Sequence, residues 1–579
     1  MRRTVGTVVM VTLMAAVAGE AQEEKQVVDP VVVTATTVAT PSRQLGVALN
    51  VIPGEDFKTY HYSTVDDAFR SIPGVNVTQQ GSYGKVSNLS IRGANANQVL
   101  ILVDGVRVSS PTLGQTDLSD ISPEQIDRIE VIRGPQSTLY GADAIGGAVN
   151  IITRKGSGRP FSAVVDNAFG NYDTMQNRLS ASGAYKIFDY ALSGAHFESN
   201  GQFKNDTSDM WAGNVRLGLT LPLDSAISVV YRYNKNDTGV PIKAVFPPPQ
   251  PIDPIINPNA KQQTETTVLS VEAKTRPVEW WESRAGFGRY TSNQGFQDPP
   301  DPGFDFDVPI RSQVDVERLE TQWLNSFFIG KWSTTTLGGG FRNEEGESTG
   351  VFRADRQVPW GLLQQQLRFF ERLFITGGFR IEHDSQFGQA TTAQGSVLFV
   401  IKETGTRLRG GAGSGFRAPT FNDLFFPDFG NPDLKPERST SWDVGVDQDL
   451  WNNRIRLRAT YFRTAFTDAI VCCTPLPTAT FGGPFNAGRA RSQGVEVGGD
   501  VDILPSLIAS VTYTYTDTDN FTTGRPLPRI PRDAGSVGLT WLPLPSLSTF
   551  VQVYVIERQF DPVGDVYNSG HTRVDLGGT

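Results

Sequence analysis

The feature of this sequence that most restricts its fold is a long series of segments in which apolar and polar side chains alternate. In NRIRLRATYF, for example, Ile455, Leu457 and Tyr461 would point to one face of a strand and Arg456 and Arg458 to the other. A soluble sandwich would bury the apolar face, whereas a membrane barrel turns it toward lipid and keeps a polar lumen. Many segments exceed the about five or six residues of an ordinary strand and are long enough to cross a bilayer at a tilt. Their length favours a transmembrane barrel.

Residues 1–18 predict export. Arg2 and Arg3 precede an apolar stretch, and Ala16 and Ala18 offer a cleavage site, so the segment has the three parts of a secretory signal peptide. A retained anchor helix is the alternative, but the apolar stretch is short and the polar segment GEAQEEKQ follows it. Together with the alternating segments, this pattern predicts a multi-pass β-barrel in the outer membrane of a bacterial cell.

The composition and motifs exclude several classes of function. A net charge of −9 is unlike that of nucleic-acid-binding proteins, which carry basic patches, so no nucleic acid is expected as a partner. The chain has no H-E-x-x-H motif and no phosphate-binding G-x-x-x-x-G-K-[ST] loop. We therefore predict that the protein is not an enzyme and requires no cofactor.

Residues 46–155 form a region of a different kind. STVDDAFRSIPGVNV places Val65, Ala68 and Phe69 at helical spacing, and short strands follow in LSIRG, QVLILVDGVRV, IDRIEVIRG and GAVNIITR. A barrel of about 20 strands has a lumen wide enough to hold such a domain. We predict that this compact region plugs a barrel formed by residues 160–579.

Two connections between barrel segments are long and rich in proline. They are residues 237–263 and 297–313, and they are too polar to be buried. Outer-membrane barrels have tight turns at one end and long loops at the outer end, so both are expected to be extracellular. They would serve either as a flexible cap or as a lid over a ligand.

Four motifs carry a resemblance to a known family: DAFRSIPGVNV, IRGANANQVLILVDGVRV, IDRIEVIRGPQSTLYGADAIGGAVNIITR and NPDLKPERSTSWDVGV. Over nearly the whole chain, they resemble the TonB-dependent outer-membrane transporters, and the plug resembles that of the cobalamin transporters most closely. The resemblance implies an all-β membrane barrel of about 22 strands with an N-terminal α+β plug domain in its lumen. Only about 20 strands can be traced, and HTRVDLGGT reads as the opening of a strand, so the C-terminal strands of the family are expected to be missing.

The resemblance also implies a function and partners. The function would be TonB-dependent uptake of a scarce large ligand, cobalamin or a related corrinoid, with ferric siderophore uptake as the alternative and a passive porin as a weaker one. The partners would be TonB, which the inner-membrane proton gradient energises, the ligand, and outer-membrane lipid and lipopolysaccharide. The protein is expected to be a monomer.

The short run DPVVVTAT, residues 29–36, resembles the TonB box of this family. Such a box pairs edge to edge with a strand of TonB, mainly through backbone hydrogen bonds. We expect it to be a disordered leader in the resting state. The residues assigned to TonB binding are Asp29, Pro30, Val31, Val32, Val33, Thr34 and Ala35.

By analogy with the family, polar contacts should hold the plug at rest and yield when it is pulled. Arg92 and Arg133 are the candidates on the plug, and Glu437 and Glu496 are the candidates on the barrel wall. Arginine and carboxylate groups fix orientation well without a dry core. The alternative is that both arginines only fix turns inside the plug.

By alignment with the cobalamin transporters, the plug loops that face the medium are residues 79–87 and 109–117. Tyr83, Ser110 and Gln115 are the candidate ligand contacts, because an aromatic ring and two hydrogen-bonding groups suit a large amphipathic ligand. Ordinary turn chemistry is the alternative for the small residues of these loops.

Calcium can order the outer loops of cobalamin transporters. Asp206, Asp209 and Asp237 supply oxygen ligands of the right kind, although the cluster has no D-x-D pair, and solvated turns are the alternative. The adjacent residues Cys472 and Cys473 lie after a predicted strand, where they could form a vicinal disulfide, pair between molecules or stay free.

Overall fold

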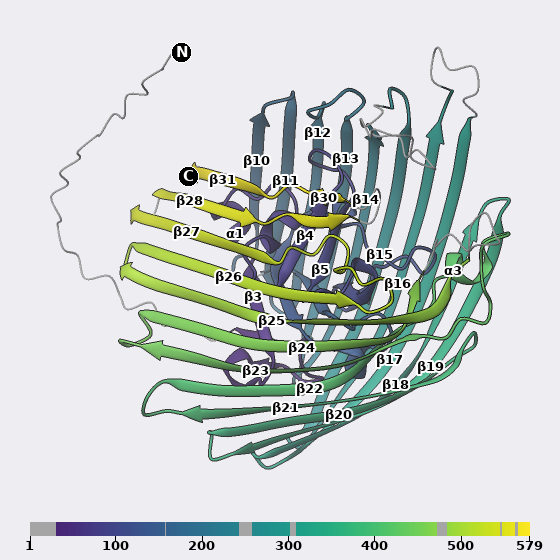
Figure 1. The fold of residues 1–579 in the computed structure, drawn as a ribbon. Coiled ribbons are helices and arrows are strands. Elements are labelled where there is room, and N and C mark those ends of the chain that lie inside the picture. Colours follow the sequence, from purple (N-terminus) through teal and green to yellow (C-terminus); the bar gives the residue numbers. More distant parts are fainter. Residues whose placement is uncertain are drawn as a thin grey trace.

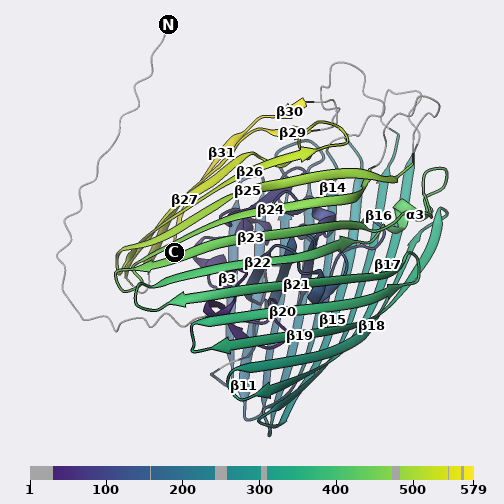
Figure 2. The ribbon, with the colours of Figure 1, turned by 60° about the horizontal axis from the view of Figure 1, so that its bottom comes forward.

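The computed structural model describes residues 30–156, 158–241, 257–300, 309–471, 483–544, 547–561 and 566–579. A large antiparallel sheet curves around a smaller domain made from the first part of the chain (Figures 1 and 2). The signal peptide, Asp29 and the two cysteines lie outside the described residues, as do parts of the two proline-rich connections.

The large sheet has 20 strands, and each pairs with the next one along the chain, except that β28 pairs with β31 across the small hairpin of β29 and β30. Short turns such as residues 222–224 join the strands at one end, and long connections such as residues 240–260 join them at the other, which is the extracellular end of such barrels. The strands are β10 Ser162–Gly170, β11 Thr174–Tyr185, β12 Phe188–Ser199, β13 Ser208–Leu221, β14 Ser225–Gly239, β15 Lys261–Val278, β16 Trp281–Asp298, β17 Ile310–Ile329, β18 Ser333–Ser348, β19 Phe352–Phe369, β20 Leu373–Asp384, β21 Gly388–Ile401, β22 Thr406–Arg417, β23 Glu437–Leu450, β24 Ile455–Val471, β25 Phe485–Leu504, β26 Leu507–Asn520, β27 Asp533–Leu544, β28 Leu547–Ile556 and β31 His571–Gly578.

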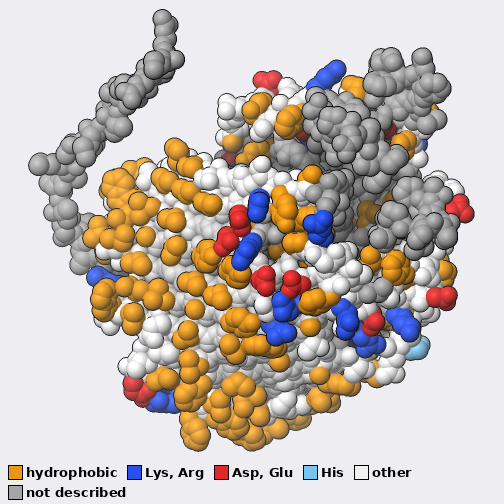
Figure 3. All heavy atoms as spheres, in the orientation of Figure 1, with side chains coloured by type: hydrophobic (Ala, Val, Ile, Leu, Met, Phe, Trp, Pro, Cys, Tyr) orange, Lys and Arg blue, Asp and Glu red, His pale blue; other side chains and the backbone are white. Residues whose placement is uncertain are grey.

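The alternation of side chains along the strands gives the sheet an apolar outer face and a polar inner face. On β19, Leu363 is 43% exposed, whereas the next residue, Gln364, is 1% exposed because it faces the plug. Figure 3 shows hydrophobic side chains spread over the left and lower parts of the outer surface, while charged side chains gather toward its centre and right. An apolar band of this kind suits contact with lipid.

Strands β10 and β31 are the two ends of this sheet, and no hydrogen bond joins them within the described residues. Three small elements lie at the extracellular end: helix α3 Phe421–Phe425 and the paired strands β29 Gln559–Asp561 and β30 Val566–Asn568. None of the helices in the described part of the chain is long and apolar enough to cross a membrane.

The inner domain, called the plug from here on, is built on a five-stranded sheet in the order β3-β8-β9-β6-β7, in which β6 and β9 run parallel. Its strands are β3 Ala48–Pro53, β6 Val99–Val103, β7 Val106–Arg107, β8 Ile126–Arg133 and β9 Gly147–Thr153, with two further pairs, β1 Val31–Val32 with β2 Thr40–Pro41 and β4 Val75–Gln79 with β5 Ser87–Ile91. Its helices are short: η1 Ser42–Gln44, α1 Asp56–Thr59, η2 Asp66–Phe69, η3 Ala96–Gln98, η4 Leu118–Asp120 and α2 Ser137–Tyr140.

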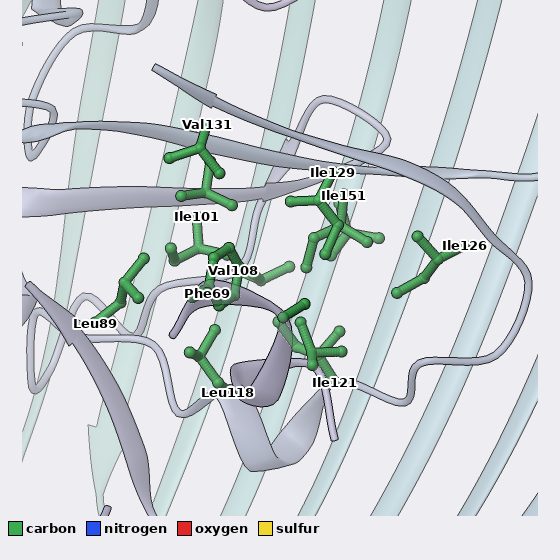
Figure 4. Close-up of a cluster of buried hydrophobic side chains, with 14 of the residues drawn as sticks. Phe69, Leu89, Ile101, Val108, Leu118, Ile121, Ile126, Ile129, Val131 and Ile151 are labelled. Carbon is green, nitrogen blue, oxygen red and sulfur yellow. The ribbon is translucent and has the colours of Figure 1, made fainter. Parts of the chain in front are cut away.

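The plug has its own hydrophobic core. Phe69, Ile101, Ile129 and Ile151 are buried in it, on the side of the sheet covered by η2 and η4 (Figure 4). Such burial of branched and aromatic side chains stabilises the plug as a compact unit. The four strand motifs of this region form strands as predicted, but the predicted helix around Ala68 is only the single 3-10 turn η2, since Pro73 and Gly74 follow closely.

Candidate functional site

The plug loop of residues 79–87 lies at the extracellular end of the barrel and is bound to the wall there. The Ser82 hydroxyl donates to the Asp206 carboxylate, which is fully buried. The Lys85 ammonium donates to the backbone carbonyls of Thr207 and, at 2.8 Å, of Gly239, and it lies 3.7 Å from the Asp206 carboxylate. Burial lowers the pKa of Lys85 to about 8. An ammonium group of the plug thus ties two outer loops of the barrel together.

The three aspartates predicted to bind calcium do not form one group, although Asp209 and Asp237 are register partners on β13 and β14. Asp206 is engaged by Lys85, as described above. Asp209 accepts from His196 at 3.0 Å, and Asp237 pairs with Lys235 at 3.3 Å. Among the described residues, no group of three or more His, Cys, Asp or Glu side chains could hold a metal ion. Calcium binding stays a prediction, and no pattern in the sequence indicates that a plug lysine reaches Asp206.

The three predicted ligand contacts lie at the extracellular side of the plug but not in one group. Tyr83 is 36% exposed, and its hydroxyl accepts from Arg573 on β31 at 3.3 Å. Ser110 and Gln115 lie together in the other outward loop, where the Ser110 amide donates to the Gln115 carbonyl at 3.1 Å. That loop is held by α3, because the Phe421 amide donates to the carbonyl of Pro111 at 3.0 Å.

Beneath this second loop, a cavity of about 110 Å³ separates the plug from the wall. Ser110 and Gln115 line it from the plug, and Asn234, Thr266 and Tyr290 line it from β14, β15 and β16. Tyr83 does not line it. Two of the three predicted ligand residues therefore border an internal space.

On another side, the plug is held by a buried cluster of charges. Arg92 lies 2.7 Å from Glu496 on β25 and 2.9 Å from Asp443 on β23, and Arg133 lies 3.2 Å from Glu496. All four side chains are buried. Burial lowers the pKa of Arg92, but Glu496 and Asp443 outweigh it and raise the value, whereas burial lowers the pKa of Arg133 to about 10. Both arginines are charged at neutral pH.

Glu437 is placed differently from the prediction. Its carboxylate lies 2.7 Å from Arg417, a neighbour on the wall, and it accepts from the Gln98 amide of the plug at 2.9 Å. It thus contacts the plug through an amide rather than through Arg92 or Arg133. Asp443 takes the predicted place of Glu437 beside Arg92 because it lies on the same strand, β23, deeper in the lumen.

A second group of charges between plug and wall was not predicted from the sequence. Arg107 of β7 lies 3.2 Å from Glu320 on β17 and 3.6 Å from Asp143. Arg318 on β17 is 1% exposed, and it donates to the backbone carbonyl of Ser109 at 2.8 Å and pairs with Glu344 at 2.7 Å. The available signal was Arg107 itself, a charged residue between the apolar residues Val106 and Val108.

The segment that resembles a TonB box is folded at the periplasmic end of the plug, which corrects the expectation of a disordered leader. Val31 and Val32 pair with Pro41 and Thr40, so the segment forms a small hairpin of its own. The amides of Val33 and Thr34 donate to one oxygen of the buried Glu130 carboxylate, at 3.0 and 2.9 Å.

Further bonds hold the same segment to the plug and the wall. The Tyr140 hydroxyl donates to the Thr34 carbonyl at 3.0 Å, and the Thr37 amide donates to Gln364 of β19 at 2.9 Å. Val32 and Ala35 are buried. A TonB strand that pairs edge to edge with this segment needs free backbone N–H and C=O groups. In this conformation Glu130 occupies two of the N–H groups that such a strand would use.

A transmembrane barrel occluded by a domain that is bonded to its wall defines the class of plugged outer-membrane receptors. Sequence comparison agrees with this class. Residues 41–148 match the TonB-dependent receptor plug domain, and residues 136–579 match the TonB-dependent receptor-like β-barrel. The chain belongs to the TonB-dependent receptor family and lies in the outer membrane.

Solved structures of this class share the fold. A copper transporter superimposes with a TM-score of 0.78 at 19% identity, covering 93% of this chain and 91% of that one. The ferric enterobactin receptor of Pseudomonas aeruginosa gives 0.76 at 19% identity, covering 95% and 92%. A siderophore receptor of Acinetobacter baumannii gives 0.73 at 18% identity, covering 93% and 91%. At these identities the likeness shows the fold alone.

Proposed function

We propose that this receptor takes up a metal chelate of the ferric siderophore type, with energy supplied through TonB. The observation that carries the proposal is the occluded lumen, in which buried ion pairs fix the plug to the wall through Arg92, Arg133 and Arg107. Removing one partner of a buried ion pair costs about 3–5 kcal/mol, so thermal motion alone does not clear the passage. An external pull on the N-terminal segment would supply the work.

The class of cargo is supported by the similar structures and limited by the cavity. Two of the similar proteins are named as receptors for siderophores, one of them for ferric enterobactin. The resemblance of the plug motifs to cobalamin transporters makes a corrinoid the second candidate. The cavity of about 110 Å³ is too small for either cargo as a whole, so the first binding step would occur above it, between the outward loops.

The test uses the full chain in a strain that lacks its own siderophore and cobalamin receptors. Iron-limited growth is measured with ferric enterobactin and with ferrichrome, and cobalamin-limited growth with cyanocobalamin, each with and without TonB. Growth on a ferric chelate that requires TonB is the expected result. Growth on cyanocobalamin alone would assign the cargo to the corrinoids, and growth without TonB would overturn energised uptake.

A matched pair of variants tests the box. V32P removes a backbone donor from the short strand and is expected to abolish TonB-dependent growth, because proline cannot join a ladder of hydrogen bonds. V32I keeps the donor and the β-branched shape and is expected to grow like the parent. Equal growth of the two variants would mean that this segment is not the TonB contact.

A further inference from the structure

The cavity beside the loop of residues 109–117 is lined by residues whose buried polar atoms have no hydrogen-bond partner in the described chain. Asn234 on β14 is 5% exposed, yet neither its side-chain oxygen nor its nitrogen has a hydrogen-bond partner among the described residues. The same holds for one terminal nitrogen of Arg232, also 5% exposed, and for the hydroxyl of Thr116. All three residues line the cavity.

Unsatisfied buried groups of this kind are costly. Leaving a buried donor or acceptor without a partner costs about 1–3 kcal/mol, and native structures hold few of them. Asp120, which lines the same cavity from the plug, adds a further unpartnered carboxylate oxygen. All of these atoms are covered by their neighbours in the closed state, so they become accessible when the plug and the wall separate. Such a set is suited to a group that both donates and accepts hydrogen bonds.

The wall at this cavity also differs from the rest of the lumen in how it holds the plug. Within the described residues, no ion pair joins β13, β14, β15 or β16 themselves to the plug; the one charged contact beside them is Lys85, which lies 3.7 Å from Asp206 in the loop before β13 and donates to the Gly239 carbonyl at the outer end of β14. Contact there includes apolar packing of Val268 and Tyr290 against the plug core, and single hydrogen bonds such as that from Arg232 to the Ser122 carbonyl at 2.7 Å. Apolar contact has no preferred direction, so one surface can slide over the other.

We propose that the cavity between residues 108–122 of the plug and strands β13 to β16 is a transit site, at which the passage opens and the cargo is held on its way through. The inference rests on the proposed energised uptake and adds its route. The anchored strands β17 to β25 keep the plug in place on the other side while this side separates.

The chemistry of the site indicates what it holds. Its volume of about 110 Å³ is well below the about 300–1,000 Å³ of ordinary ligand pockets, so it suits one arm of a chelate and not a whole one. Arg232 and Asn234 offer donors to a hydroxamate, catechol or amide oxygen, and Thr116 and Asp120 offer oxygens to a hydroxyl or amide N–H. The site therefore suits a neutral or weakly acidic arm rich in oxygen.

The route is tested by thiol labelling in living cells. The two native cysteines, Cys472 and Cys473, are replaced by serine, and a single cysteine is introduced by T266C at the cavity or by T376C. Thr376 is a matched control, because it is a threonine of β20 that lines a smaller gap of about 30 Å³ on the anchored side. Cells receive a mixture of ferric enterobactin, ferrichrome and cyanocobalamin, and a membrane-impermeant methanethiosulfonate reagent is added with or without a proton uncoupler.

Labelling of the T266C variant is expected to rise severalfold when TonB is energised, while labelling of T376C stays constant. Equal rises at both positions, a larger rise at T376C, or no rise at either would overturn the route. Failure of the proposed function is distinguishable, because it would abolish TonB-dependent growth on the ferric chelates. A wrong route alone would leave that growth intact.

The binding role is tested by N234L, with N214L as its control. Asn214 also lines the cavity, but its amide already donates to Ser193 at 2.9 Å. Replacing the unsatisfied Asn234 by an apolar side chain should raise thermal stability. It should also slow uptake of radioactive iron from the ferric chelate that supports growth by about tenfold, with binding at the cell surface unchanged. Unchanged uptake by N234L, or an equal loss in N214L, would overturn the role.

Discussion

The two sides of the interface between plug and barrel are built from different interactions. On the side of β17 to β25, the plug arginines Arg92, Arg133 and Arg107 meet carboxylates of the wall at 2.7 to 3.2 Å, and all three are buried. On the side of β13 to β16, the wall offers apolar contacts, a few hydrogen bonds and a cavity with unsatisfied polar atoms.

This difference shows how one domain can close a pore and still let it open. Buried ion pairs fix position and orientation and are costly to break one partner at a time. A side held by a single charged contact, that of Lys85 at its outer end, can part at lower cost and later return to the same place, guided by the side that stays bound. The interface therefore has a fixed side and a yielding side.

The largest effect is expected from removing Glu496, the carboxylate shared by two plug arginines. E496A leaves Arg133 without its wall carboxylate and takes the closest partner from Arg92. Loss of one partner from a buried ion pair costs about 3–5 kcal/mol, so the plug should loosen from its fixed side. Single-channel recording should show a leak conductance, and the thermal midpoint should fall.

The control is E345Q, which changes a wall glutamate that makes an exposed pair with Arg353 at 3.7 Å. Exposed pairs contribute about 0–1 kcal/mol, so this variant should behave like the parent. A tight, non-leaking E496A would show that the charges are not what fixes the plug.

A smaller effect is expected at the box. E130A removes the carboxylate that accepts from the amides of Val33 and Thr34. Hydrogen bonds to a charged group contribute about 1.5–3 kcal/mol, so the box should be released more often and should bind a purified periplasmic TonB fragment more tightly. R128Q is the control, because Arg128 contacts the oxygen of Glu130 that does not bind the box, at 2.8 Å, and otherwise pairs with the exposed Asp127. Equal affinity of E130A and the parent would rule out Glu130 as the group that restrains the box.

The smallest effect is a pH dependence of the outward loop that carries Lys85. Docking of the loop lowers the pKa of the Lys85 ammonium from 10.5 to about 8. Between pH 8 and 10.5 the undocked loop therefore binds more protons than the docked loop. Raising the pH through this window should favour the docked loop. A nitroxide label at Y83C, in the background without native cysteines, should become less mobile from pH 8 to 10. The K85M variant has no group that titrates in this window, so the mobility of its label should not change with pH. If the mobility of the label in the parent protein is equally independent of pH, Lys85 has no docking role.

Sequence patterns predicted the architecture because alternation, strand length and the plug motifs are local. Leu363 and Gln364 illustrate this, since their order along one strand settles which of them faces lipid. The patterns also named Arg92, Arg133 and Glu496, whose side chains the fold brings together.

What the sequence did not show depends on contacts between distant segments. Asp443 and Arg107 reach their partners only once the plug is inside the barrel, and nothing near them in the chain marks those partners. The folded state of the box depends on Glu130, about a hundred residues away. The cavity arises from mismatched surfaces, which side-chain patterns along one strand do not describe.

The most direct test of the fixed and yielding sides is to fill each gap with the same bulky side chain and measure transport. T266W fills the cavity at β15, and T376W fills the smaller gap at β20. Heat-modifiable mobility in gels checks that both variants fold. Uptake of iron from the ferric chelate that supports growth should be lost in T266W, with surface binding retained, and should persist in T376W. Transport that survives in T266W and stops in T376W would contradict the account.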